Sequence, residues 1–473
     1  MDLRINQLTG RFVTESLASE ILEANIEPRL IFNRAVIDSR EVKEGDLFIA
    51  LPGNRVNGHD FVKEAIDKGA TAAMIQEKNQ AFVSLPTVLV KQSLTALQKL
   101  ARAWRTHLQV EVIAITGSVG KTTTKKLTSW ILEQYYSTAS NPRNYNNEIS
   151  VPLCLLEIKP ENQKAVIEMG MYEIGDIQFL CEIAKPQVGV VLNVGPVHLA
   201  RAGSLPNIQK AKSELPKSID VDGFTVLNLD DSNVWKMKNT TNGIIISYSA
   251  LGNSNADIYA SDIVELATGK IQFAINYDNK KVFTQLDSLG IHLVENALAA
   301  AAAGLAANLS LEQVCAALST APNVDRVKKI LLQDGSVLLD DTYNSQPKSL
   351  AAILQVMKKT QGYRVALLAD MLELGELSDS EHEFAGKLAA DSLDHLVTLG
   401  SAARIMAAAA AKNGLKKVDI AHSNDEAIDY IVKGLRAKST VLIKGSQAFE
   451  LNNFIPQIVS DYGVTIEQAG RPE

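Results

Sequence analysis

A glycine-rich turn with one lysine and three threonines occupies residues 117–124, which read Gly-Ser-Val-Gly-Lys-Thr-Thr-Thr. Two glycines let the backbone curl so that its N–H groups point inward, as phosphate binding requires. Lys121 can reach the outer phosphates of a nucleotide, and the Thr122 hydroxyl can bind a phosphate-bound Mg²⁺. The spacing is the shorter G-x-x-G-K-T form, because Ile115 stands where the full P-loop has glycine. The predicted nucleotide contacts in this turn are Gly117, Ser118, Val119, Gly120, Lys121, Thr122 and Thr123.

A carboxylate and an imidazole follow two further predicted strands. The predicted strand at 165–167 is followed directly by Glu168, and the predicted strand at 188–194 leads to His198. The carboxyl ends of parallel strands meet at one edge of a sheet, so both side chains should gather near Lys121. An isolated loop histidine is more often satisfied by local hydrogen bonds. Its position one strand beyond Glu168 favours a Mg²⁺ site beside the triphosphate.

Lys212 lies on a predicted helix that begins near Pro206. Taken alone, it is a solvated helix lysine, and its positive charge would be repelled by a magnesium site. Addition of CO₂ to the neutral amine would convert it into a carbamate anion, which suits such a site. The residues alone leave both interpretations open.

Other polar side chains stand in loops, where ligand contacts concentrate. Ser39, Arg40, Asn57 and His59 lie in glycine-flanked turns of the first hundred residues. On pattern alone each is more often a turn or capping residue. The stretch 144–148 is rich in amides, and Asn296 interrupts an alanine-rich helix, where it could bind a ligand or cap a neighbour.

The elements that must position these side chains form an α/β pattern. Residues 110–115 are apolar and β-branched, which predicts a strand buried on both faces. Residues 256–287 alternate as antiparallel strands do, and beyond residue 321 apolar strands alternate with helices. The sequence therefore predicts three α/β domains: a small N-terminal domain at 1–108, a central P-loop-type domain at 109–320 and a C-terminal Rossmann-like open sheet at 321–473. The central sheet should be mostly parallel, with helices on both faces.

Composition excludes several functional classes. The 473 residues are 46% apolar and carry a net charge of −7, so no nucleic-acid-binding surface is expected. An anionic ligand must then be bound by local basic groups. The longest apolar run, 297–309, is too short to span a membrane, and the N-terminal residues show no basic-then-apolar signal pattern. Three scattered cysteines indicate a reducing compartment, and we expect a cytoplasmic protein.

Six blocks together resemble the ATP-dependent Mur ligase family over nearly the whole chain. They are residues 115–125, the N-x-N-N-E pattern at 144–148, Glu-Met-Gly-Met at 168–171, His198, Ala-Lys-Ser-Glu at 211–214, and Asp-Thr-Tyr-Asn-Ser-Gln-Pro at 341–347. The Tyr343-Asn344-x-x-Pro347 form favours the member that adds a dipeptide. The resemblance implies that a monomeric enzyme joins D-alanyl-D-alanine to a UDP-linked muramyl tripeptide through an acyl phosphate. The small molecules are its only implied partners.

The resemblance also implies ATP, two Mg²⁺ ions and roles for individual residues. Lys121, His198 and Lys212 would be catalytic. Thr122 and Glu168 would bind one Mg²⁺, and His198 with carbamoylated Lys212 would bind the second. Further nucleotide contacts would be Asn296, Arg326, Asp341 and Asn344. The implied substrate contacts are Ser39, Arg40, Asn57, His59, Asn147 and Glu148.

Other interpretations stay open on the sequence. A second is another amide ligase of the group, such as the third-residue ligase or a folylpolyglutamate-synthase-like enzyme. A third is a catalytically silent scaffold of Mur type. The intact residues that argue against it are Lys121, Thr122, Glu168, His198 and Lys212. A GTPase switch is weaker still, because no Asn-Lys-x-Asp signature follows the phosphate loop.

Overall fold

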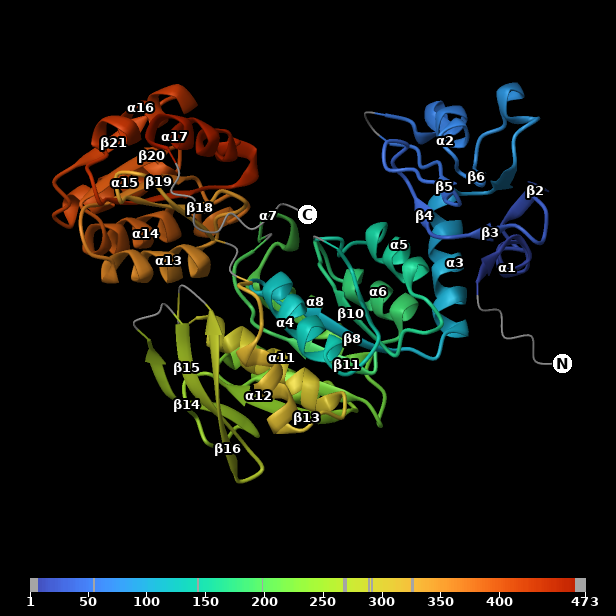
Figure 1. Ribbon diagram of the computed structural model, residues 1–473, viewed down its shortest axis with the longest axis horizontal. Helices are drawn as coiled ribbons and strands as arrows, with labels where there is room; N and C mark the ends of the chain where they lie inside the picture. Colours follow the sequence, from blue (N-terminus) through green and yellow to red (C-terminus); the bar gives the residue numbers. More distant parts are fainter. Residues whose placement is uncertain are drawn as a thin grey trace.

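The computed structural model describes residues 7–53, 56–142, 144–197, 199–266, 270–287, 290, 292–324 and 327–463. Figure 1 shows three groups of elements in chain order, each built on its own main sheet. The predicted α/β fold class, with a mostly parallel central sheet and an open C-terminal sheet, is confirmed. No helix in the described ranges is long and apolar enough to cross a membrane.

The N-terminal group contains a five-stranded sheet of order β2-β7-β6-β5-β4 and a two-stranded ladder of β1 with β3. Its strands are β1 (Leu8–Thr9), β2 (Ile21–Asn25), β3 (Ile31–Phe32), β4 (Ala35–Val36), β5 (Leu47–Ile49), β6 (Ala72–Ile75) and β7 (Thr87–Val90). Its helices are α1 (Gly10–Ser16), α2 (Val62–Asp67) and α3 (Ser93–His107), with short 3₁₀ turns at Gly58–Phe61 and Gln80–Phe82.

The central sheet has nine strands in the order β16-β15-β14-β13-β12-β11-β8-β10-β9. The strands from β9 to β14 in this order pair in parallel, and β14, β15 and β16 pair antiparallel, as the alternation at 256–287 predicts. The strands are β8 (Glu111–Thr116), β9 (Thr138–Ser140), β10 (Lys164–Glu168), β11 (Val188–Val191), β12 (Phe224–Asn228), β13 (Ile244–Ser249), β14 (Ile258–Glu265), β15 (Lys270–Tyr277) and β16 (Lys280–Asp287).

Helices cover both faces of this sheet. Alternate residues of its inner strands therefore point into two different hydrophobic cores, one on each face. Val112 and Ala114 of β8 pack on the side of α5 and α6, whereas Ile113 and Ile115 pack on the side of α4, α11 and α12. The helices are α4 (Lys121–Glu133), α5 (Ser150–Glu157), α6 (Asp176–Ala184), α7 (Leu199–Ala202), α8 (Leu205–Lys212), α9 (Glu214–Lys217), α10 (Ser232–Trp235), α11 (Leu293–Ala306) and α12 (Leu311–Ser319), with a 3₁₀ turn at Lys236–Asn239.

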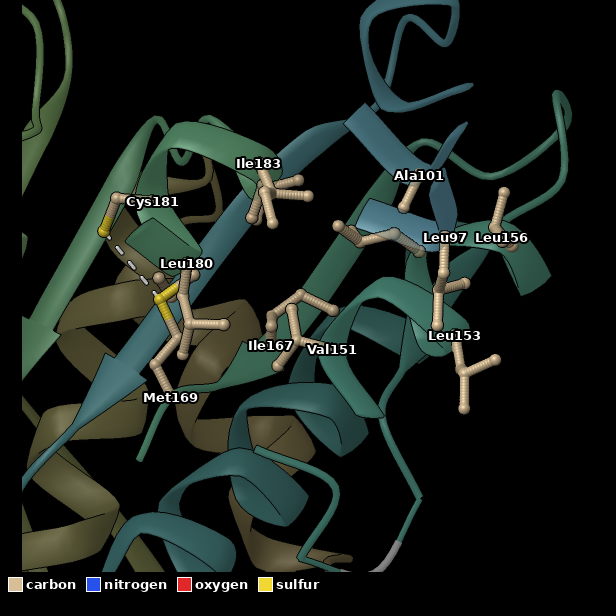
Figure 2. Packing of buried hydrophobic residues seen from close by; sticks show 14 of the residues in the cluster. Leu97, Ala101, Val151, Leu153, Leu156, Ile167, Met169, Leu180, Cys181 and Ile183 are labelled. Carbon is tan, nitrogen blue, oxygen red and sulfur yellow. Dashed lines mark hydrogen bonds between the residues drawn. The ribbon is translucent and has the colours of Figure 1, made fainter. Parts of the chain in front are cut away.

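The long helix α3 packs the N-terminal group against the central sheet. Figure 2 shows Leu97 and Ala101 of α3 in one apolar cluster with Val151 and Leu153 of α5. Two polar anchors border this cluster. Trp104 Nε1 donates to the Ile158 carbonyl at 2.9 Å, and Arg105 Nε donates to the Ala184 carbonyl at 2.7 Å. These buried bonds fix α3 on the side of the sheet that carries α5 and α6.

The C-terminal sheet has the order β17-β18-β22-β19-β20-β21, and all its pairs are parallel except that of the edge strand β17. Helices α13 to α15 cover one face and α16 and α17 the other. The strands are β17 (Lys328–Leu331), β18 (Val337–Asp341), β19 (Arg364–Ala369), β20 (His395–Leu399), β21 (Val418–Ala421) and β22 (Thr440–Lys444). The helices are α13 (Pro347–Lys359), α14 (Ser378–Ser392), α15 (Ala403–Lys412), α16 (Asn424–Gly434) and α17 (Phe454–Tyr462), with 3₁₀ turns at Gly375–Leu377, Gln447–Phe449 and Leu451–Asn453.

Candidate active site

The glycine-rich turn lies between β8 and α4, and its last position, Gly120, accommodates only glycine without strain. Gly120 has φ +86°, a backbone conformation that is costly for residues with a Cβ. A Cβ added there would lie 2.4 Å from Asn296 Oδ1 on α11. Gly117 has a similar constraint, because its Cβ would lie 2.8 Å from Leu192 Cβ. The turn is therefore wedged between α11 and the end of β11.

The turn's backbone donors fall into two sets. The N–H groups of Ser118 and Val119 donate to the backbone oxygen and to Oδ1 of Asn193, at 3.1 and 2.9 Å. They are therefore engaged within the protein. The first turn of α4 is the other source of donors, because the first amides of a helix have no acceptor within the helix. These amides, together with the positive end of the helix dipole, are suited to binding an anion at Gly120, Thr122 and Thr123.

Lys121 bends back over the turn. Its ammonium donates to the carbonyl oxygens of Gly117 and Ser118 at 2.7 and 3.2 Å. A phosphate held by the α4 amides would therefore meet a lysine already placed above the same turn.

Glu168 ends β10, the strand next to β8, so its carboxylate reaches the start of α4. The side chain is 1% exposed and well bonded. Thr122 Oγ1 donates to Oε2 at 2.9 Å, and Asn146 Nδ2 donates to Oε1 at 2.8 Å. The predicted meeting of Glu168 with the phosphate loop is thus present. Two oxygen donors in contact, one anionic and one neutral, fit the ligand preference of Mg²⁺.

Three residues that hold Glu168 were not among the predicted site residues. Besides Asn146, the Asn141 side chain accepts from the Glu168 N–H at 2.9 Å and donates to its carbonyl at 3.2 Å. Lys125 Nζ donates to the Asn141 carbonyl at 2.5 Å and lies 3.9 Å from Glu168 Oε2. For the two asparagines a signal was available, because four of the seven residues 141–147 are asparagines.

Lys212 is buried at the end of α8, with 2% of its surface exposed, which contradicts its description as a solvated lysine. It lines the same cavity of about 110 Å³ as Lys121, Gly117 and Gly170. Burial, with a smaller contribution from the charge of Lys121, lowers the pKa of Lys212 well below its usual value. A lowered pKa favours the neutral amine, the form that reacts with CO₂.

The rest of this cavity combines amide, acidic and apolar side chains. Its further lining residues are Asn146, Asn147, Glu148, Met171, Tyr172, Asp176, Phe179, Leu180 and Val197. Asn147 also has a local role, because its Oδ1 accepts from the backbone N–H groups of Ile149 and Ser150 at the start of α5. Of the predicted substrate contacts, Asn147 and Glu148 therefore border the cavity that contains Lys121 and Lys212.

The predicted substrate contacts of the N-terminal group do not line this cavity. Asn57 accepts from the backbone and ring N–H groups of His59, at 3.1 and 2.8 Å. His59 Nε2 accepts from the Gln76 N–H at 3.0 Å, and burial lowers its pKa. Ser39 donates to Glu64 at 3.3 Å, and the exposed Arg40 pairs with Asp38 at 2.6 Å. Arg40 is the member of this set whose side chain is mostly exposed.

The C-terminal candidates lie on another sheet. Asp341 ends β18 and accepts from Lys444 Nζ at 2.6 Å, and the same ammonium donates to the Asn344 carbonyl at 2.8 Å. The loop that follows them reaches the phosphate turn, because Gln346 and Lys348 line a second cavity of about 60 Å³ with Ser118 and Val119. His198 and Arg326, a predicted metal ligand and a predicted nucleotide contact, lie outside the described residues.

Comparisons with known proteins agree with this architecture. Three family models match consecutive parts of the chain. The Mur ligase family catalytic domain matches residues 34–105, the Mur ligase middle domain matches residues 115–304, and the Mur ligase glutamate ligase domain matches residues 325–447.

Relatives match along most of their length. The UDP-N-acetylmuramoyl-tripeptide–D-alanyl-D-alanine ligase of Buchnera aphidicola subsp. Baizongia pistaciae is 32% identical over 90% of this chain and 92% of its own. A crystal structure of MurF from Acinetobacter baumannii has a TM-score of 0.86 at 29% identity and covers 97% of this chain and 100% of its own. MurF ligase from Thermotoga maritima, in complex with ADP, has a TM-score of 0.79 at 26% identity, over 90% of this chain and 97% of its own. The resemblance stated from the sequence is confirmed, and the chain belongs to the Mur ligase family.

Proposed function

We propose that this enzyme joins D-alanyl-D-alanine to UDP-N-acetylmuramoyl-tripeptide with ATP, in the synthesis of peptidoglycan precursors. The terminal carboxylate of the tripeptide takes the γ-phosphoryl group of ATP, which releases ADP. The amine of D-alanyl-D-alanine then attacks the acyl carbon, loses a proton and displaces phosphate, leaving an amide. The observation that carries the proposal is one cavity lined by both Lys121 and Lys212, on a chain that matches dipeptide-adding ligases over most of its length.

Lys121 and the first amides of α4 have the task of stabilising the phosphoryl group during transfer. Charge develops on its oxygens, and donors fixed in advance lower the barrier without reorganising. The close packing of Gly120 against the Asn296 side chain supports this role, because it leaves the turn little freedom to move. Ser118 and Val119 contribute mainly by shape, since Asn193 accepts from their N–H groups.

Two Mg²⁺ ions belong to the proposal. Thr122 and Glu168 would hold the first, and the fit rests on their oxygen atoms being 2.9 Å apart in a buried site. His198 and Lys212 would hold the second. Bound magnesium would neutralise charge on the phosphates and the substrate carboxylate. Asn146 keeps Oε1 of Glu168 directed, and Lys125 adds a nearby positive charge to the same carboxylate.

Lys212 would act as a carbamate. Its neutral nitrogen forms a bond to the carbon of CO₂ and releases one proton to solvent, so that a neutral amine becomes an anion. Burial supports this step, because it favours the neutral amine that reacts.

The remaining assignments concern substrate and arrangement. The domains would be 1–108, 109–320 and 321–473, with the UDP end of the substrate bound by the first. Ser39, Arg40, Asn57 and His59 are its proposed contacts, and Asn147 and Glu148 would face the peptide. Asn296, Arg326, Asp341 and Asn344 would contact the nucleotide. We further propose that the protein is a monomer and that it works in the cytoplasm. Three buried, unpaired cysteines support the second part, because free thiols are typical of a reducing compartment.

ADP formation tests the proposal directly. The purified protein is given ATP, Mg²⁺ and UDP-N-acetylmuramoyl-tripeptide, with either D-alanyl-D-alanine or a single amino acid as acceptor. We expect ADP only with the dipeptide. ADP formed equally well with single amino acids would favour another ligase of the family, and no ADP with any acceptor would favour a silent scaffold.

A further inference from the structure

Glu295 occupies a position that the reaction described above does not use. It lies in the first turn of α11, next to Asn296, and its side chain is 19% exposed. Amide groups from two strand ends of the central sheet contact Oε1 of its carboxylate. Asn228 Nδ2, at the end of β12, donates at 3.1 Å, and Asn193 Nδ2, after β11, lies at 3.5 Å.

Asn193 is itself the partner of the phosphate turn. Its backbone and side-chain oxygens accept from the N–H groups of Ser118 and Val119, and its Nδ2 donates to the Val119 carbonyl at 3.1 Å. The side chain is 4% exposed, so it has few alternative partners. The carboxylate of Glu295 is therefore one hydrogen-bonded residue away from the turn.

The C-terminal sheet reaches the same carboxylate through α13. Lys348, in the first turn of α13, contacts both oxygens of Glu295 at 3.0 Å. Figure 1 shows α13 on the side of its sheet that faces α11 and the β14–β16 strands. Lys348 follows directly on Gln346 and Pro347, which line the second cavity together with Ser118 and Val119. A single carboxylate thus joins α13 to the asparagine that holds the turn.

A second ion pair at the other end of α13 provides an internal comparison. Lys359 contacts Glu265 of β14 at 2.8 Å, and both lysines are 55% exposed. Glu265 is 41% exposed, and its carboxylate pairs with Lys359. The two pairs fasten the same helix to the same part of the molecule. Only the Glu295 pair leads on to the phosphate turn.

We propose that Glu295 is a positioning residue, which couples the docking of α13 to the shape of the phosphate turn and so to ATP affinity. Lys348 fixes the Glu295 carboxylate, the carboxylate fixes the Nδ2 side of Asn193, and Asn193 fixes the amides of Ser118 and Val119. The inference rests on the proposed function only in taking the turn as the ATP site. An exposed ion pair contributes little to stability by itself, so the effect should be seen in ATP binding.

A double-mutant cycle on ATP binding tests this coupling. The dissociation constant of MgATP is measured by calorimetry for the parent, Glu295→Gln, Lys348→Met and the double variant, without muramyl substrate. We expect each single change to weaken binding about threefold to fivefold and the double change to weaken it no further. Glu265→Gln and Lys359→Met, which break the comparison pair, should leave binding unchanged.

Three outcomes would overturn the inference. They are unchanged ATP binding in Glu295→Gln, losses that multiply in the double variant, and equal losses in Glu265→Gln. Circular-dichroism melting curves of every variant identify a change that acts through unfolding, because such a change would lower Tm and ATP binding together. The proposed function is tested by a separate assay, which measures ADP formation by the parent protein. Failure of that assay with an intact binding cycle would leave the coupling standing.

Discussion

Replacing Gly120 with alanine should damage the phosphate turn by an amount that the structure defines. At φ +86° a residue with a Cβ costs about 1–2 kcal/mol more than glycine. The new Cβ would lie 2.4 Å from Asn296 Oδ1, so the Asn296 side chain must move. That movement breaks the 3.3 Å bond from Thr124 Oγ1, worth about 1 kcal/mol. We expect Gly120→Ala to lower the free energy of unfolding by about 2–3 kcal/mol.

ATP affinity should fall further than stability in this variant, because the amides of α4 begin at Gly120. If the turn moves by a fraction of a hydrogen-bond length, its amides no longer meet the phosphates in the right geometry. MgATP binding should then weaken about 10- to 100-fold. Gly414→Ala is the matched control. Gly414 has φ +98°, nothing lies within 4 Å of its added Cβ, and it lies in the turn between α15 and β21 of the C-terminal group. It should lose about 1–2 kcal/mol of stability and no ATP affinity.

The assays are urea unfolding followed by circular dichroism and calorimetric titration with MgATP. ATP binding within twofold of the parent in Gly120→Ala would refute the reasoning, since the turn would then tolerate displacement. Equal loss of ATP affinity in Gly414→Ala would refute it in another way, because strain anywhere in the chain would suffice.

Three further substitutions address the cavity itself. Lys121→Ala should reduce kcat about 10²- to 10³-fold while Tm stays near the parent value, because the transferred phosphoryl group loses a charged partner; ADP release measures it, and activity within a few-fold of the parent would contradict the role. Asn146→Ala frees one oxygen of Glu168 and should raise the Mg²⁺ concentration for half-maximal ATP binding about tenfold; an unchanged Mg²⁺ requirement would remove Asn146 from the site. Lys212→Ala should lose turnover and regain part of it with added short carboxylates, which can replace a carbamate; absence of rescue at every concentration would leave no support for carbamoylation.

Much of the site's position could be predicted from local sequence. The apolar run before Gly117 indicates a strand that is buried on both faces of a sheet. The glycine-lysine-threonine turn follows this run, so it must lie at the carboxyl end of that strand. Glu168 follows a strand of the same kind, so the meeting of these two strands at one sheet edge brings it to Thr122. Parallel-sheet geometry explains both successes. In contrast, β6 was not predicted, because its alanine-rich residues lack the β-branched signature of a strand.

Contacts that depend on tertiary packing could not be predicted in this way. The burial of Lys212 arises because the end of α8 faces the cavity, and nothing in the residues around it distinguishes that face from a solvated one. His59 accepts from an N–H seventeen residues away, a partner that a turn pattern does not indicate. Asn193 and Glu295 are 102 residues apart in sequence and meet only because β11 and α11 are neighbours in the fold.

The proposed reaction activates a carboxylate as an acyl phosphate before the amine attacks. The most direct test follows a heavy oxygen isotope placed in the terminal carboxylate of UDP-N-acetylmuramoyl-tripeptide. Full turnover with ATP and D-alanyl-D-alanine should transfer one labelled oxygen to the phosphate released, as seen by mass spectrometry of that phosphate. Phosphate that carries no label after complete ligation would contradict the claim.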